Sequence, residues 1–411
     1  MIHVAYGLCD LDGHYSKFCG TSILSIFENT REQVTVHIIH DQTLTPDNRD
    51  KFIYLAGQYN QWIKFYDVDA CAPERMRYLR QSLAERFGAF SLIGMFFRLL
   101  IPEIISPSLD KIIYLDAGDT IVNLDIKKLW NVELGDRPLA AASDYDRFQN
   151  VPQQRNLCDD GFVEPEKYFN SGVLIINLEL WRANMDKIFG RGGGYDLWIN
   201  NYRRYTFFDQ DILNYCFAKD AVRLPDEFNC FVIFERMGEN RSMIRQKLYH
   251  FAGFKPDLNI DDPFNRLWFE YFTKTPWFDV EMFKGLFHVF NQQYDRQKIE
   301  LLNVSNLQAR RRRSFFVEPH NVEALRGLFK VADDEPVFNA SAPDALRLLA
   351  NTMHNDGGRH VCFILHGNYN SIRQFLLTQN FVENLDFINA IIFLNSQMGV
   401  PLSSQNVLRM M

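Results

Sequence analysis

The stretch KIIYLDAGDTIV, residues 111–122, is an apolar run that ends on two acids, Asp116 and Asp119, and then becomes apolar again. Its first half has the β-branched and aromatic composition of a buried strand. Ligands of parallel α/β sheets gather at the carboxyl ends of the strands, so we expect both carboxylates at a ligand-binding edge. Such oxygen clusters suit hard divalent cations. Taken alone, the pattern fits equally well a turn capped by Asp119 beside a solvated Asp116.

The composition limits the class of protein. With 411 residues, 47% of them hydrophobic, the chain can bury a large core and is expected to form two globular units. Its 44 basic and 51 acidic residues give a net charge of -7, so we expect no nucleic-acid partner. Seven cysteines without a CxxC pair indicate neither a disulfide framework nor a zinc ribbon. No signal peptide or long uncharged apolar run is recognisable, and the expected location is the cytoplasm.

Strand-like runs alternate with amphipathic, helix-like segments from the start of the chain. This alternation predicts an α/β fold with a mostly parallel central sheet and helices on both faces. We predict one domain over residues 1–280, a linker with a helical extension over 281–313, and a smaller Rossmann-like α/β domain over 314–411. The strand-like runs of the first domain are HVAYGLC (3–9), VTVHIIH (34–40), IKFYDV (63–68), KIIYLDA (111–117), PLAAASD (138–144) and SGVLIINL (171–178).

Two features of the last part of the chain bear on partners. The turn HGNYNS, residues 366–371, has one glycine where a dinucleotide-binding turn needs three, so we predict no nicotinamide cofactor. Four consecutive arginines, residues 310–313, precede Phe315 and Phe316. This patch is consistent with peripheral contact to an anionic inner membrane face, or with a solvated basic turn at a domain boundary.

A series of short motifs covers the first ~280 residues and resembles glycosyltransferase family 8, the retaining nucleotide-sugar transferases with a GT-A fold. Each motif is moderately specific, but their occurrence in the family's order is hard to obtain by chance. The motifs are the turn at residues 12–15, MFFRLLIPEII (95–105), YLDAGD (114–119), YFNSGVLIINLELWR (168–182), FFDQDILNYCF (207–217), LYHFAGFKP (248–256) and EYFTKTPW (270–277).

The resemblance implies a metal site made by Asp116, Asp119 and His250. Two carboxylates and an imidazole favour Mn²⁺, with Mg²⁺ as the alternative. The family's motif has one residue between its two acids, whereas here Ala117 and Gly118 separate them. We expect Gly118 to take a positive φ and bulge the turn, so that both carboxylates can reach one ion.

The resemblance also implies how a UDP-sugar is held. Asp12 and Tyr15 are expected to bind the uridine, and Gly253 and Lys255 the diphosphate. The element HFAGFKP, which carries the last two, is one residue shorter than is usual in the family. Arg98 lies in an apolar segment and therefore needs an anionic partner. That partner is either an internal carboxylate or, as the resemblance implies, the nucleotide sugar.

For the sugar, the resemblance points to Asn170, Asp209, Gln210 and one of Asp144 or Asp146, of which we favour Asp144. A double displacement needs a carboxylate beneath the anomeric carbon, and the family has the glutamine there. An amide is a weak nucleophile, so a retaining front-face mechanism is implied. We therefore expect Gln210 and Asp209 to be the catalytic pair.

The function expected from these residues is transfer of a hexose from UDP-galactose or UDP-glucose to a hydroxyl of a bacterial glycan, lipopolysaccharide or glycoprotein. One alternative is a GT-A fold that has lost activity and serves as a binding or scaffold protein. The other is a sugar nucleotidyltransferase. The chain lacks the glycine-rich, Arg- and Lys-bearing loop that normally follows the first strand of that class.

Overall fold

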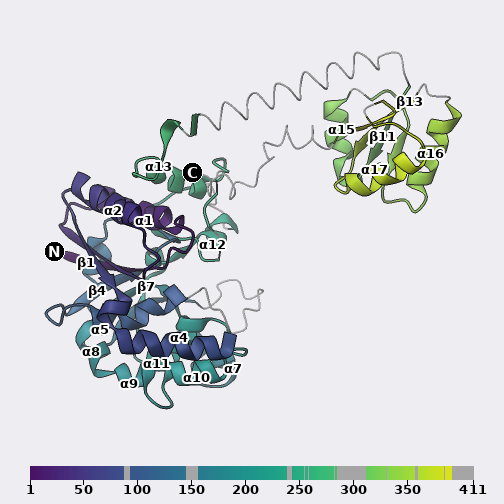
Figure 1. Cartoon of the computed structure of the whole chain (residues 1–411). Coiled ribbons are helices and arrows are strands. Elements are labelled where there is room, and N and C mark those ends of the chain that lie inside the picture. The colour runs from purple at the N-terminus through teal and green to yellow at the C-terminus, as the bar shows by residue number, and fades with distance from the viewer. Residues whose placement is uncertain are drawn as a thin grey trace. The chain divides into compact units, whose positions relative to one another are not determined.

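The computed structural model divides the chain into two compact units, residues 1–278 and 279–411 (Figure 1). Each is described by itself. The structure describes residues 1–87, 93–144, 156–237, 243–253, 255–257, 259–281, 283–284, 312–329, 331–356, 360–383 and 385–390. Most of the predicted linker, residues 285–311, lies outside this part of the chain.

A seven-stranded sheet forms the centre of the first unit, in the order β3-β2-β1-β4-β7-β6-β8. Neighbouring strands are parallel except at β7, which is antiparallel to both β4 and β6. The mostly parallel sheet is thus confirmed. The direction of β7 was not predictable, because a buried strand is apolar whichever way it runs. The strands are β1 (Ile2–Leu8), β2 (Val34–His40), β3 (Trp62–Asp67), β4 (Lys111–Leu115), β6 (Leu139–Ser143), β7 (Phe169–Asn177) and β8 (Val222–Leu224).

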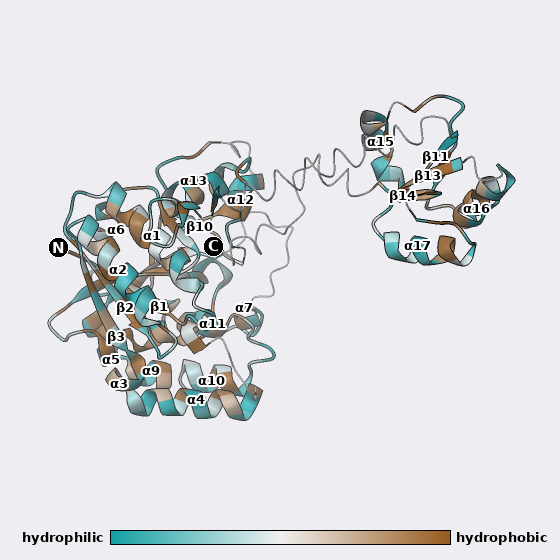
Figure 2. Ribbon diagram, turned by 45° about the horizontal axis from the view of Figure 1, so that its top comes forward, coloured by the Kyte–Doolittle hydropathy of each residue, from teal (hydrophilic) through white to brown (hydrophobic). Residues whose placement is uncertain are grey.

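Helices cover both faces of this sheet. Figure 1 shows α1 and α2 on one side and α4, α5 and α8 to α11 on the other. In Figure 2 the strands are mostly brown and the outward turns of the helices teal, as expected for a core between the layers. The helices are α1 (Tyr15–Asn29), α2 (Pro46–Gln58), α3 (Val68–Cys71), α4 (Pro73–Phe87), α5 (Ile101–Ile104), α6 (Lys127–Trp130), α7 (Asn156–Asp159), α8 (Leu178–Ala183), α9 (Met185–Phe189), α10 (Gly194–Asn200), α11 (Phe208–Phe217), α12 (Val232–Met237) and α13 (Pro263–Phe272), with 3-10 turns η1 (Ile93–Leu100), η2 (Pro165–Lys167) and η3 (Asp226–Phe228).

A second, three-stranded sheet joins distant parts of the sequence near the end of β4. It consists of β5 (Thr120–Val122), β10 (Leu248–His250) and β9 (Cys230–Phe231), with β10 in the middle. The antiparallel pairing of β10 with β5 places His250 opposite Thr120. The backbone N–H of Phe251 also donates to the carbonyl of Asp119 at 2.7 Å. This small sheet therefore brings His250 to the acidic turn.

The second unit is a small α/β domain with a parallel sheet in the order β12-β11-β13-β14. Its strands are β11 (Arg312–Val317), β12 (Val337–Asn339), β13 (His360–Leu365) and β14 (Phe387–Asn389). Its helices are α15 (Val322–Leu328), α16 (Ala345–Asn355) and α17 (Tyr369–Thr378), with the 3-10 turn η4 (Pro319–Asn321). The α/β character predicted for this region is confirmed.

The structure corrects one expectation about this unit. Phe315 and Phe316 are 0% and 3% exposed and pack in the cores on the two sides of β11. Arg313 donates to Glu335 at 2.8 Å rather than standing free. The idea that these two phenylalanines touch a membrane surface is therefore wrong. Among the described residues, no helix combines the length and apolar character that a membrane crossing requires.

The packing of Trp277 on α1 gives a test of the first unit. A Cβ atom at Gly20 would lie 2.2 Å from Cζ3 of Trp277, whose Nε1 donates to Asn48 at 2.8 Å. We predict that Gly20→Ala lowers the free energy of unfolding by about 1–3 kcal/mol, because the buried ring has to move. Gly57→Ala in α2, with nothing within 4 Å of its Cβ, should be neutral or stabilising by up to about 1 kcal/mol. Urea unfolding of both variants measures the difference, and equal stabilities would contradict this packing.

Candidate active site

A cleft of about 690 Å³ lies at the carboxyl ends of β1 and β4. Ten of the twelve residues expected to form the site line it: Asp12, Tyr15, Arg98, Asp116, Asp119, Asn170, Asp209, Gln210, His250 and Gly253. The other two are bonded to lining residues. Asp144 accepts from Gln210 Nε2 at 2.6 Å, and Lys255 Nζ donates to the Tyr15 hydroxyl at 3.0 Å. The alternative acid, Asp146, lies outside the described residues.

Asp116, Asp119 and His250 converge at one end of this cleft. Their ligand atoms all lie within 4.8 Å of one another. Asp116 Oδ2 is 3.6 Å from His250 Nε2, while Asp116 Oδ1 is engaged by Arg98. One oxygen of Asp116 is thus committed to the protein and the other faces the imidazole. Two carboxylates and a nitrogen around a common point fit a divalent transition-metal ion such as Mn²⁺.

Two glycines make room for this cluster. The backbone of Gly118 is not in the positive-φ region, so that expectation is wrong. Its lack of a side chain matters for another reason, since a Cβ there would be 2.5 Å from Cζ of Tyr15 and 2.6 Å from Lys255 Nζ. Gly172 in β7 is equally confined. A Cβ there would lie 2.3 Å from His250 Cε1 and 2.6 Å from Asp116 Oδ2.

Arg98 is buried between two acids of the cleft. Its guanidinium donates to Asp116 at 2.6 Å, lies 3.1 Å from Asp209, and donates to the carbonyl of Ser171 at 2.7 Å. Of the two partners considered for this arginine, the internal carboxylates are the ones the structure shows. They join the end of β4 to the start of α11.

The two acids that share Arg98 titrate differently. Burial raises the pKa of Asp209 to about 6, against the opposing pull of Arg98. Burial also acts to raise the pKa of Asp116, but Arg98, His250 and Lys255 outweigh it and hold that pKa below its ordinary value. Asp116 is therefore ionised at neutral pH, as a metal ligand must be.

His250 is held in an orientation suited to metal binding. Burial lowers its pKa, so the imidazole is neutral at pH 7. Its Nδ1 is 2.9 Å from Oδ1 of Asn229, and its Nε2 faces Asp116. A hydrogen on Nδ1 leaves a lone pair on Nε2. Asn229 was not predicted from the sequence, because it lies outside every motif that carried the resemblance.

Lys255 reaches the same cluster from the loop after β10. It forms an ion pair with Asp119, and its Nζ lies 4.5 Å from the centre of the Tyr15 ring. The shortened HFAGFKP element therefore still delivers a positive charge to this end of the cleft.

The turn after β1 is organised by an acid that the sequence analysis overlooked. Asp10 is 1% exposed and accepts the backbone N–H of Tyr15 at 2.6 Å and the amide of Asn48 at 2.9 Å. Asp12 is exposed and accepts only a local bond, from the N–H of His14 at 3.0 Å, among the contacts of the described residues. Asp10 therefore shapes the turn, and Asp12 is left facing the cleft. The position of Asp10 just after the first strand was the signal in the sequence that could have pointed to this role.

Gln210 and Asp209 stand at the start of α11 and line the same cleft. Gln210 Oε1 accepts from Asn170 Nδ2 at 2.9 Å and from the N–H of Ser171 at 3.1 Å. Phe208, the residue before Asp209, has a φ of 47°. A non-glycine residue in that region costs of the order of 1 kcal/mol, a strain that proteins tend to keep at functional sites. This backbone conformation directs the first turn of α11 toward the cleft.

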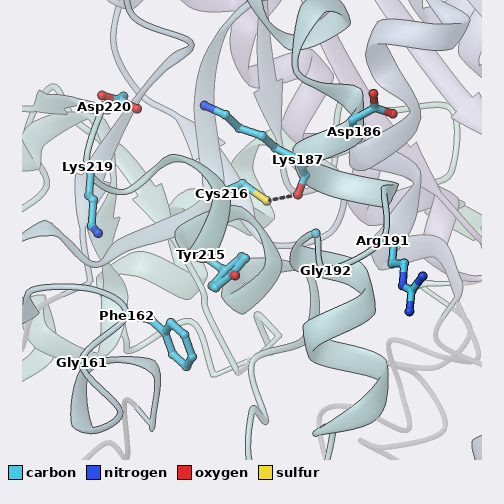
Figure 3. Close-up of a pocket in the computed structure, with 11 residues that line it drawn as sticks. Gly161, Phe162, Asp186, Lys187, Arg191, Gly192, Tyr215, Cys216, Lys219 and Asp220 are labelled. Carbon is cyan, nitrogen blue, oxygen red and sulfur yellow. Dashed lines mark hydrogen bonds between the residues drawn. The ribbon is translucent and has the colours of Figure 1, made fainter.

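A second cavity, of about 660 Å³, lies between α9, the end of α11 and the loop at residues 161–162 (Figure 3). It contains none of the predicted site residues. Figure 3 shows Lys187, Arg191 and Lys219 directed to different places rather than toward a common point. Despite its similar size, it has no converging acids, so the cleft at the ends of β1 and β4 is the candidate active site.

Comparison with known proteins shows the family of this chain. The family described as Glycosyl transferase family 8 matches residues 7–260. This chain belongs to glycosyltransferase family 8. The resemblance drawn from its motifs is thereby confirmed.

Relatives of this family 8 protein include enzymes named for lipopolysaccharide. The lipopolysaccharide 1,2-glucosyltransferase of Escherichia coli is 32% identical over 232 residues, which are 56% of this chain and 62% of that enzyme. The lipopolysaccharide 1,3-galactosyltransferase of Salmonella typhimurium is 26% identical over 229 residues, 55% of this chain and 63% of that enzyme. The chain thus spans less than two thirds of the length of these relatives.

The fold has counterparts among solved structures. The galactosyltransferase LgtC, solved with donor and acceptor sugar analogs, aligns with a TM-score of 0.54 at 21% identity, over 68% of this chain and 98% of LgtC. The bifunctional glycosyltransferase WbbM aligns with a TM-score of 0.52 over 69% of this chain and 51% of WbbM. The predicted GT-A fold is confirmed.

The confinement of Gly172 gives a test of the metal cluster. We predict that Gly172→Ala weakens Mn²⁺ binding at least ~10-fold, because the new methyl group separates Asp116 from His250. Titration of Mn²⁺ monitored by electron paramagnetic resonance measures the affinity. Gly57→Ala, which meets no neighbour, is the matched control. An unchanged affinity in Gly172→Ala would show that the three ligands do not act on one ion.

Proposed function

We propose that this protein is a metal-dependent retaining hexosyltransferase. It would move a hexose from a UDP-sugar to a hydroxyl of a glycan, lipopolysaccharide or glycoprotein acceptor. The observation that carries the proposal is the convergence of Asp116, Asp119 and His250 in the same cleft as Gln210 and Asp209. A metal cluster and a sugar-side pair are the two parts that the reaction needs.

The first part concerns the leaving group. Breaking the bond between the anomeric carbon and the phosphate oxygen leaves negative charge on the diphosphate, and groups that stabilise this charge accelerate the reaction. A Mn²⁺ ion held by the three ligands would supply Lewis-acid stabilisation of the phosphates. Lys255 adds a charge beside Asp119. Gly253, with a φ of 78°, turns the loop so that its backbone can approach the phosphates.

The second part concerns the sugar. The amide of Gln210 is bonded at both ends, to Asn170 and Ser171 through Oε1 and to Asp144 through Nε2. A group held in this way orients and polarises the substrate rather than attacking it. In a front-face transfer, the acceptor oxygen bonds to the anomeric carbon as the phosphate leaves. The departing phosphate oxygen takes the acceptor's proton.

Hexose donors are favoured by the names of the relatives, which are glucosyl- and galactosyltransferases. We therefore propose UDP-glucose or UDP-galactose as the donor, with Asp12 and Tyr15 at the uridine. All seven cysteines are free, which suits a reducing compartment, and we propose that the enzyme works in the cytoplasm.

A binding or scaffold role remains the second candidate, since the spacing of Asp116 and Asp119 departs from the family motif. The convergence of the three ligand groups favours the enzyme instead. Family membership likewise disfavours a sugar nucleotidyltransferase.

Metal dependence is the first test of this function. We predict that the protein with Mn²⁺ releases UDP from UDP-glucose or UDP-galactose, and that EDTA abolishes the release. Asp119→Ala should lower the rate at least ~100-fold, because the ion loses one of its ligands. Asp136→Ala, at a 97% exposed side chain, is the control. The scaffold alternative would be supported if the affinity for UDP did not change on addition of Mn²⁺ and no UDP were released from the UDP-sugars.

The role of Gln210 is the second test. Replacing it by alanine should lower turnover about 100-fold while changing UDP affinity by less than about 3-fold, because the amide acts on the sugar and not on the nucleotide. Initial rates and UDP titrations separate the two effects. Gln81→Ala, on the exposed face of α4, controls for loss of an amide. Equal losses in turnover and UDP affinity would exclude this role.

A further inference from the structure

A row of hydrogen-bonded side chains connects the metal cluster to the sugar end of the cleft. It starts at His250 Nδ1, which is 2.9 Å from Asn229 Oδ1. Asn229 Nδ2 donates to Asn170 Oδ1 at 2.9 Å, and Asn170 Nδ2 donates to Gln210 Oε1 at 2.9 Å. Gln210 Nε2 then donates to Asp144 Oδ2 at 2.6 Å. All five residues lie within the first unit, and no two of its four links share an atom.

In the three links between Asn229 and Asp144 the donor lies on the side of His250. The direction of the first link depends on the tautomer of His250. At the far end, Gln210 Nε2 meets a carboxylate oxygen of Asp144, which accepts an amide hydrogen. Gln210 must therefore present its nitrogen to Asp144 and its oxygen to Asn170. The same requirement passes to Asn170 and then to Asn229, whose oxygen is left for the imidazole.

Two backbone groups fix the same direction independently. The N–H of Gly172 donates to Asn170 Oδ1 at 2.9 Å, and the N–H of Ser171 donates to Gln210 Oε1 at 3.1 Å. A backbone N–H cannot reverse its role as a donor, so neither amide can flip without losing a bond. The imidazole must then carry its hydrogen on Nδ1, which leaves the Nε2 lone pair directed toward the metal cluster.

We propose that Asn229 is a positioning residue for both halves of the site. Its oxygen fixes the tautomer of His250, and its nitrogen holds Asn170 and, through Asn170, the amide of Gln210. Asn229 is 4% exposed and follows the 3-10 turn η3, next to β9. Partners of metal-bound histidines commonly tune affinity by about 10- to 100-fold. The inference rests on the proposed metal-dependent transfer, but it concerns a residue outside the lining of the cleft.

Replacing Asn229 by aspartate separates its two roles. Asn229→Asp keeps an oxygen for His250 Nδ1 but cannot donate to Asn170. We expect Mn²⁺ affinity within about 3-fold of the wild type, because a carboxylate partner supports a metal-bound histidine, and turnover at saturating Mn²⁺ at least ~10-fold lower. Asn229→Ala removes both bonds and should lower affinity and turnover alike. Mn²⁺ titration and UDP release from UDP-glucose and UDP-galactose give the two readouts.

A double-mutant cycle tests the connection to Gln210. If Asn229 acts through Asn170 on that amide, Asn229→Asp should cause no further loss of turnover in a Gln210→Ala background. Asn29→Ala is the matched control. It removes amide bonds to Ser25, Val122 and Tyr271, about 20 Å along α1 from Tyr15, and should change neither readout.

The metal-free protein provides a measurement that does not depend on activity. In protein labelled with ¹⁵N in its histidine rings, the two nitrogens of His250 should show the Nδ1–H tautomer, and Asn229→Ala should give a mixture. Signals of His250 are assigned by their loss in His250→Asn. If wild-type protein shows this tautomer but releases no UDP, the proposed function fails, while the role of Asn229 in fixing the tautomer of His250 stands. A wild-type Nε2–H tautomer, or wild-type turnover in Asn229→Asp, would overturn the inference.

Discussion

The site depends on one buried cation. Arg98 is 5% exposed and holds Asp116 at the end of β4 and Asp209 at the start of α11. A buried guanidinium is stable only when its charge is matched and its hydrogen bonds are made, and the two acids and the carbonyl of Ser171 supply both. The same contacts hold Asp116, of the metal cluster, near Asp209, of the proposed catalytic pair. Arg98, an arginine in an apolar segment, thus links Asp116 and Asp209 through ion pairs.

The reversed strand β7 is the platform on which these halves meet. Because β7 runs antiparallel to β4, with Leu115 opposite Val173, its first residues lie beside the last residues of β4. Asn170 bonds to Gln210, Ser171 bonds to Arg98, and Gly172 leaves the space that Asp116 and His250 fill. Three consecutive residues therefore contact Gln210, Arg98 and the metal cluster in turn. A parallel β7 would carry them to the opposite edge of the sheet.

The sequence predicted the parts of the site that are local. The apolar run before Asp116 placed the acids at the end of a strand, and the ordered motifs located the side chains that the cleft brings together. It did not predict contacts made by residues outside the motifs, or the reason why a motif glycine is needed. Position 118 needs a glycine because a Cβ atom would clash with the ring of Tyr15, and not because of its φ. The importance of Asn229 comes from its hydrogen bond to His250, 21 positions away. The burial of Phe315 likewise depends on its neighbours in β13 and α15, which a basic run beside it does not reveal.

The charges of the cleft explain why an ion and a diphosphate should bind together. Asp119 is paired with Lys255, whereas Asp116 and Asp209 share Arg98, so three carboxylates face two cations and a neutral imidazole. Asp12 also lines the cleft, so its carboxylates outnumber its cations and would repel a diphosphate. Under the proposed function, a divalent cation held by Asp116, Asp119 and His250 would offset this charge. Its bond to Asp119 would leave Lys255 available for a phosphate oxygen. Asp119, placed between the proposed ion site and the lysine, would in this way couple metal binding to donor binding through electrostatics.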